Sequence, residues 1–305
     1  MRRRALLFGL SAVACGPKAA PALPSAPAVT SAFELIPPDL DVVVRLDLAR
    51  VKAALGVTAF TALSRQVLAH DSGGQEPDEL VVASLLTAEQ VYLAYRPSPL
   101  WAPLDRVLAM QGHFEPLRPP RGFSGATDLG RDLRHWDSRS APSGRGGVAR
   151  VYALGDRVRA FVSEAELDAV ERTLDGRGSA RRLEPPEEGT LSLAARPSLL
   201  GRLAGHGTLR ELLEDAKALR AVADLESDGA RLKLELLLSG AEQARQLASA
   251  GKLVLARALG DAVLDVTLGA ESDRVVLSAR LTRAQLAPVL ACVWGGTASA
   301  LACPW

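Results

Sequence analysis

Two stretches in the second half of the chain repeat one pattern, and this repeat restricts the fold more than any other feature. Each begins with a Glu-Ser-Asp triplet, at residues 226–228 and 271–273, an offset of 45 residues. Apolar residues occupy every second position after each triplet, and a further strand-like segment precedes it. A period of two is typical of a strand with one buried face. The repeat therefore predicts two hairpins, each followed by a helix.

Four junctions between a strand and a helix carry the same helix-start signal. In a capping box, a Ser or Thr is followed three residues later by Glu or Gln, and each side chain satisfies a backbone N–H of the other residue. The four pairs are Ser163 with Glu166, Thr208 with Glu211, Ser239 with Glu242, and Thr282 with Gln285. We expect Leu219 to lie on the second helix, and Pro288 to distort the last one.

The first half of the chain contains a similar alternation of strands and helices. Residues 42–48 alternate between apolar and polar positions, which predicts a strand with one buried face, and Gly56 ends the helix that follows it. Residues 116–147 are rich in Pro, Gly, Ser and Arg and are expected to form a long irregular excursion. The remaining expected elements are helices near residues 57–69 and 80–86, strands at 91–95, 107–112 and 190–195, and a hairpin of 148–154 with 157–162.

These elements predict an α+β fold. A Pro-Pro pair precedes a strand at residues 37–38 and again at 185–186, an offset of 148 residues. We therefore expect two similar lobes, residues 33–184 and 185–305, each an antiparallel sheet of hairpins with helices packed on one face.

The first fifteen residues have the shape of an export signal. Arg2, Arg3 and Arg4 precede a short apolar run that ends in small residues directly before Cys15. A run this short cannot cross a hydrocarbon core of about 30 Å as a helix. Residues 1–14 are thus expected to be a signal peptide. Residues 15–32, rich in Pro and Ala, are expected to be a semi-extended tether.

The segment around Cys15 resembles the lipobox of bacterial lipoproteins, although the family usually has Leu where this chain has Ala12. The resemblance implies cleavage before Cys15, acylation of its thiol and amino group, and stable attachment to a membrane through several acyl chains. Gly16 after the cysteine resembles the sorting pattern for the outer membrane. An ordinary secretory signal remains the alternative, because Ala-x-Ala also suits the general signal peptidase.

Three cysteines are present, Cys15, Cys292 and Cys303. An odd count in an exported chain needs an explanation, and lipidation of Cys15 leaves one pair. The loop between Cys292 and Cys303 contains two glycines and can close, and an oxidising compartment favours a disulfide worth roughly 2–3 kcal/mol. The alternative is a pair of buried free thiols.

Neither the composition nor the motifs of the chain indicate a catalysed reaction. Without the three leader arginines the formal charge is near −2, which argues against nucleic-acid binding. The chain lacks HExxH, paired Cys/His, GxSxG and phosphate-binding glycine motifs, so no catalytic residue, metal, nucleotide or cofactor is expected. His135, beside Trp136 and Asp137, is the only local polar and aromatic cluster.

The Pro-Pro-Asp-x-Asp-Val-Val-Val opening, the leader and the hairpin–helix repeats together resemble uncharacterised lipoproteins of Gram-negative bacteria. The resemblance implies an envelope location, facing the periplasm or the surface, and carries no activity. We therefore expect a non-catalytic binding or scaffold module with an envelope protein as its partner. The alternatives are a carrier of a hydrophobic ligand and an enzyme of unrecognised type.

Overall fold

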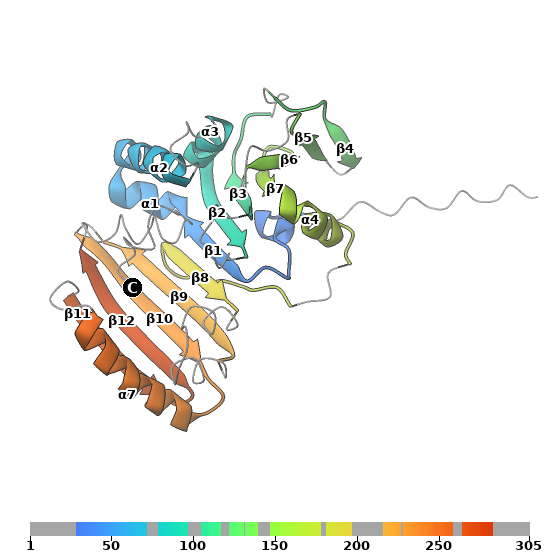
Figure 1. Cartoon of the computed structure of the whole chain (residues 1–305). Coiled ribbons are helices and arrows are strands. Elements are labelled where there is room, and N and C mark those ends of the chain that lie inside the picture. Colours follow the sequence, from blue (N-terminus) through green and yellow to red (C-terminus); the bar gives the residue numbers. More distant parts are fainter. Residues whose placement is uncertain are drawn as a thin grey trace, which may run out of the picture.

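A computed structural model describes residues 29–71, 79–96, 105–116, 122–130, 132–139, 147–177, 181–196, 216–226, 228–258 and 264–282. The described strands form one antiparallel sheet in the order β11-β12-β10-β9-β8-β1-β2-β3-β7-β6-β5-β4 (Figure 1). The fold is therefore α+β, as the sequence predicted.

The elements alternate between hairpins and short helices along the chain. The strands are β1 (Val42–Asp47), β2 (Ala88–Tyr95), β3 (Arg106–Gly112), β4 (Thr127–Gly130), β5 (Leu133–Asp137), β6 (Val148–Leu154), β7 (Val158–Ser163), β8 (Leu191–Ala195), β9 (Ala218–Leu225), β10 (Gly229–Leu237), β11 (Leu264–Glu271) and β12 (Arg274–Thr282). The helices are η1 (Ala32–Leu35), α1 (Leu48–Leu55), α2 (Val57–Asp71), α3 (Glu79–Thr87), η2 (Glu164–Glu166), α4 (Leu167–Leu174) and α7 (Ala241–Ala258).

The two halves of the chain share one sheet, where we had expected a separate sheet in each lobe. β1 pairs with β2 on one side and with β8 on the other, so the first strand of each half joins them at the centre. Both strands are rich in apolar residues, and pairing them satisfies two backbone edges that would otherwise be open to pairing with another chain. Residue 184 lies in the segment that connects the two halves of this sheet.

The segment at residues 184–188 connects the two halves of the chain. It lies over the pair of β1 and β8 and is held there by side chains of these two strands. Arg45 Nη1 donates to the carbonyl oxygen of Glu187 at 2.8 Å, and Ser192 Oγ donates to that of Pro186 at 2.5 Å. Both Arg45 and Ser192 are buried. Hydrogen bonds from buried side chains to backbone carbonyls stabilise an irregular segment that no ladder satisfies.

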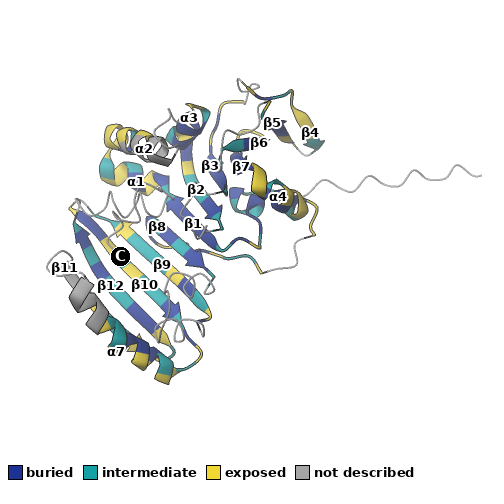
Figure 2. Ribbon diagram, viewed as in Figure 1, coloured by how far each residue is buried: buried dark blue, intermediate teal, exposed yellow. Residues whose placement is uncertain are grey.

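Helices cover both faces of the N-terminal half, so the expected placement on one face was wrong. One apolar cluster contains Val44 with side chains of α1, α2 and α3, and the other contains Val43 with side chains of η1 and α4. Successive residues of a strand point to opposite faces. Val43 is therefore buried on the face that we had expected to be solvated, because a central strand needs cover on both sides. Figure 2 shows this burial in β1, β2, β3 and β7.

Part of the expected irregular excursion at residues 116–147 is also regular. β4 and β5 lie within it and extend the sheet beyond β6. His135 and Trp136 on β5 are paired with Tyr152 and Val151 on β6, and both are buried. The polar composition of the segment concealed these strands, because β5 is held in the sheet by β6, which lies outside the segment, and β4 pairs with β5.

The described residues of the second half contain two hairpins and one helix. β9 and β10 form the first hairpin, β11 and β12 form the second, and α7 follows β10 as predicted. Leu219 lies on β9 and not on a helix, because its backbone pairs with Leu236 and Ala195. The helices expected to begin at Thr208 and Thr282 lie mostly or wholly outside the described residues.

The capping box at Ser163 and Glu166 does not form, although helix follows. Ser163 Oγ accepts instead from the N–H of Arg106, and the Glu166 carboxylate binds the Arg96 guanidinium. Both side chains are therefore used in contacts between elements. Burial raises the pKa of the Glu166 carboxyl, and hydrogen bonding and charge attraction from Arg96 oppose that rise.

Gly189 is held against the sheet in a conformation that favours glycine. Its φ is +81°, and a Cβ at this position would lie 2.4 Å from Cγ1 of Val222. Gly176 has a similar φ of +69° but no atom within 4 Å of such a Cβ. We expect Gly176→Ala to lower the free energy of unfolding by about 1 kcal/mol through backbone strain, and Gly189→Ala by about 2–4 kcal/mol through strain plus overpacking. Urea denaturation followed by tryptophan fluorescence measures both; equal losses would contradict the close contact at Gly189.

Candidate functional site

A row of side chains runs across one face of the sheet, from the buried strands of the N-terminal half to the more exposed strands of the C-terminal half. Arg45 is paired with Ser192, Ser192 with Val222, Val222 with Lys233, and Lys233 with Ser278. Residues directly opposite each other in an antiparallel sheet lie on one face. The row begins buried at Arg45 and Ser192 and becomes exposed at Lys233.

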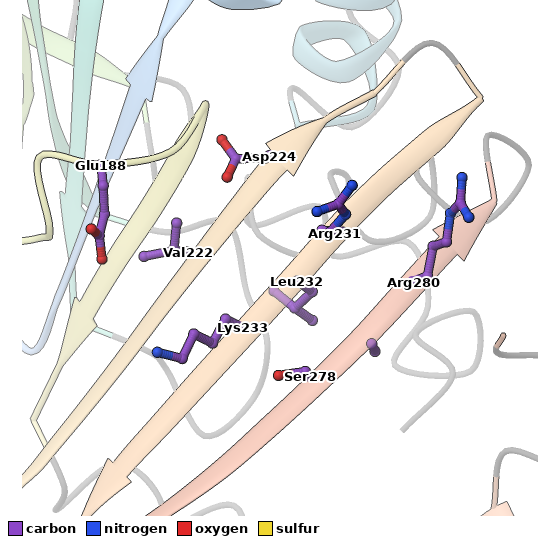
Figure 3. A pocket seen from close by; sticks show the side chains of 9 residues that line it. Glu188, Val222, Asp224, Arg231, Leu232, Lys233, Ser278 and Arg280 are labelled. Carbon is purple, nitrogen blue, oxygen red and sulfur yellow. The ribbon is translucent and has the colours of Figure 1, made fainter. Parts of the chain in front are cut away.

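On this face, β9, β10 and β12 form the floor of a shallow hollow, and the connecting segment at residues 184–188 forms one wall. The hollow has a volume of about 670 Å³, and a smaller one of about 260 Å³ continues it along the wall. Lys233 lies at the centre of the floor, between Val222 and Ser278 (Figure 3). The ionisable side chains that line one or both of these hollows are Glu184, Glu188, Arg220, Asp224, Arg231, Lys233, Glu235 and Arg280.

Two ion pairs lie along the floor. Arg231 contacts Glu226 at 2.6 Å, and the central Lys233 contacts Glu235 at 2.6 Å. Hydrogen bonding to Glu235 raises the pKa of Lys233, and hydrogen bonding to Lys233 lowers the pKa of Glu235. The side chain of Lys233 is 53% exposed, so water screens this pair. Such pairs contribute about 0–1 kcal/mol each, and they order the charged groups more than they stabilise the fold.

Two further carboxylates line the hollow. Glu188 projects from the wall and Asp224 from β9 (Figure 3). The lining therefore offers four basic and four acidic groups. It lacks the basic excess that is typical of surfaces that bind nucleic-acid phosphates.

The cysteines of the sequence analysis lie outside the described residues. Cys15 precedes residue 29, and Cys292 and Cys303 follow residue 282. Lipidation of Cys15 and the disulfide between Cys292 and Cys303 therefore remain predictions.

Two histidines have described side chains, and they differ in burial. His113 is exposed, whereas His135 is only 7% exposed and lies on β5 opposite Tyr152. His206 lies outside the described residues. Within the described residues, no group of three or more His, Cys, Asp or Glu side chains has an arrangement suited to a metal ion.

Sequence reasoning missed the hollow, although one signal for it was present. The alternation that places Leu232, Leu234 and Leu236 on one face of β10 also places Lys233 and Glu235 on the other. Which other side chains share that face depends on pairing among strands far apart in the sequence, and on a connecting segment that no local pattern positions.

Among the described helices, none combines the length and the apolar character needed to span a bilayer. No protein-family model and no curated protein sequence matches the chain. Solved structures do match: crystal forms I, III and IV of TP0453 align with TM-scores of 0.55, 0.53 and 0.51 at 14%, 13% and 13% sequence identity. These alignments cover 87% of this chain and 98%, 99% and 97% of TP0453. At this level of identity the likeness shows that the two proteins share the α+β fold, and it carries no activity.

Proposed function

We propose that this chain is a non-catalytic protein of the cell envelope, anchored by acylation of Cys15, whose folded part binds a protein partner through the charged face of β9, β10 and β12. The anchor rests on the lipobox-like leader and on the tether before residue 33. That the two halves are similar copies of a hairpin–helix plan is part of the same proposal. The attachment is expected at the outer membrane.

The charged face is the observation that supports binding most directly. Helices η1 and α4 cover the same face of the sheet in the N-terminal half, where its residues are apolar. In the C-terminal half the face carries Arg231, Lys233 and Glu235 on one strand and is hollowed beside the wall. A rigid sheet with ordered charges of both signs suits recognition of a complementary surface, because such charges exclude wrong partners and fix the register of binding.

The anchor is tested by metabolic labelling of the full chain with a radiolabelled fatty acid. We expect label in the wild-type protein and none in Cys15→Ser, because the thiol is the attachment point for the diacylglyceryl group. Cys292→Ser serves as the matched control and is expected to keep the label. Equal labelling of Cys15→Ser would contradict the anchor while leaving the binding face untested.

The binding face is tested by photo-cross-linking in the cells that produce the protein. A benzophenone amino acid at Ser278, on the floor of the hollow, is expected to capture a discrete partner, and one at the exposed Ala62 of α2 is not. Lys233→Glu is expected to reduce capture roughly tenfold or more through charge repulsion. The same change at Lys252, exposed on α7, is the matched control. Undiminished capture by Lys233→Glu would contradict binding at this face.

A second function is favoured by the opposite face. There α1 and α3 pack on β1, β2 and β3, while α7 packs on β11 and β12. Between these two groups of helices lie apolar side chains that are only partly buried, which suits an aliphatic ligand. They are Leu191, Leu193, Ala221, Ala223, Leu225, Leu232, Leu234 and Leu277.

Native mass spectrometry of the mature chain carrying Cys15→Ser distinguishes this carrier function. If the protein carries an aliphatic ligand, a non-covalent adduct of lipid mass co-purifies with it, and Leu234→Gln lowers the bound fraction several-fold because a polar group then faces the ligand. The exposed-site variant Lys252→Glu is expected to keep the adduct. A protein that is free of adduct in both backgrounds would exclude the carrier function.

A further inference from the structure

A cluster of ionisable side chains ties the edge of the sheet to α4. Arg150 on β6 donates from Nε to Asp137 Oδ1 on β5 at 2.5 Å, and from Nη1 to Glu171 Oε1 on α4 at 2.5 Å. Its Nη1 also donates to the hydroxyl of Tyr152 at 3.1 Å. One guanidinium therefore holds two strands and a helix, and bonds to charged groups are the stronger kind of hydrogen bond.

His135 is buried inside this cluster with one nitrogen unsatisfied. Its Nδ1 lies 3.6 Å from Asp137 Oδ1, too far for a hydrogen bond, and this nitrogen has no hydrogen-bond partner among the described residues. The imidazole faces Asp137 on its own strand, Arg150 and Tyr152 on β6, and Glu171 on α4, while Thr127 is its partner on β4. Its ring centre is 5.7 Å from that of Tyr152.

We propose that His135 is an acid-sensitive latch, and that its protonation draws Asp137 away from Arg150 and opens the outer strands β4 and β5. A charged imidazole needs an acceptor at Nδ1, and the nearest carboxylate oxygen is the one that Arg150 already uses. The cluster then holds two cations that compete for Asp137. The strand that loses this contact is next to the last strand of the sheet, with only the short β4 beyond it.

The direction of the pH effect follows from burial. Desolvation lowers the pKa of His135 below its ordinary value of about 6.5, the Arg150 charge lowers it further, and Asp137 and Glu171 oppose the shift. The unfolded or opened chain therefore binds a proton more readily than the closed one. The closed edge is most stable above about pH 6.5. Its stability decreases as the pH falls from there towards the pKa of His135 in the folded chain.

Hydrogen exchange of the full mature chain, read by mass spectrometry at pH 7.5 and 5.5 and corrected for the intrinsic rates, tests the latch. We expect a roughly threefold or larger increase in opening for residues 133–137 at pH 5.5, and no such increase for the central strand β2. His135→Phe keeps an aromatic ring beside Tyr152 and is expected to abolish the increase. His113→Phe, at the exposed histidine, is expected to retain it.

A second variant keeps the proposal testable if His135→Phe does not fold. Asp137→Asn removes the contested carboxylate, so β5 is expected to be less protected at both pH values and to lose most of its pH dependence. An acid increase that persists in His135→Phe or in Asp137→Asn would overturn the latch. An increase that spreads equally to β2, or no increase in the wild-type chain, would overturn it as well.

Discussion

The pairing of β1 with β8 is the interaction on which the rest of the structure depends. It joins two sets of hairpins into one sheet and places the connecting segment across the seam, where Arg45 and Ser192 hold the carbonyls of Glu187 and Pro186. Without this pair of strands, each half would expose a backbone edge. The same seam decides where the charged hollow lies, because the connecting segment that it fixes is the wall of the hollow.

Burial of the two faces changes along the sheet, and with it the surroundings of the charged side chains. In the N-terminal half, some charged side chains are enclosed and bind groups of the protein itself. Arg159 is 7% exposed, donates to Ser84 Oγ at 3.0 Å and stacks over Phe114. Removing one partner from such a buried contact leaves an unsatisfied charge, which costs several kcal/mol. In the C-terminal half, the side chains of Arg231 and Lys233 are 75% and 53% exposed, so substitutions there are expected to change stability little.

Local patterns in the sequence were sufficient for elements whose signal is contained within a few residues. The hairpin of β6 and β7, the helix α1 that ends before Gly56, and the helix α7 that follows β10 all form where expected. Local patterns predicted the wrong contact where a residue far away in the sequence competes for the same side chain. Ser163 and Glu166 fit a capping box, but Arg106 and Arg96, more than fifty residues away in sequence, take both side chains. β4 and β5 likewise depend on β6, and the hollow depends on strand order.

The latch and the hollow lie towards opposite ends of the sheet, and this separation follows from the strand order. β5 is next to last at one end, and β12 is next to last at the other. β4 is an edge strand with one neighbour, and β5 has only this short strand on its outer side. Both strands are therefore expected to open at lower free energy than central strands, and they can respond to protonation without unfolding the core. The strands β1, β3 and β7, buried on both faces, lie between the hollow and the edge at β4 and β5. A binding face and a pH response can therefore coexist in one sheet without a hinge between domains.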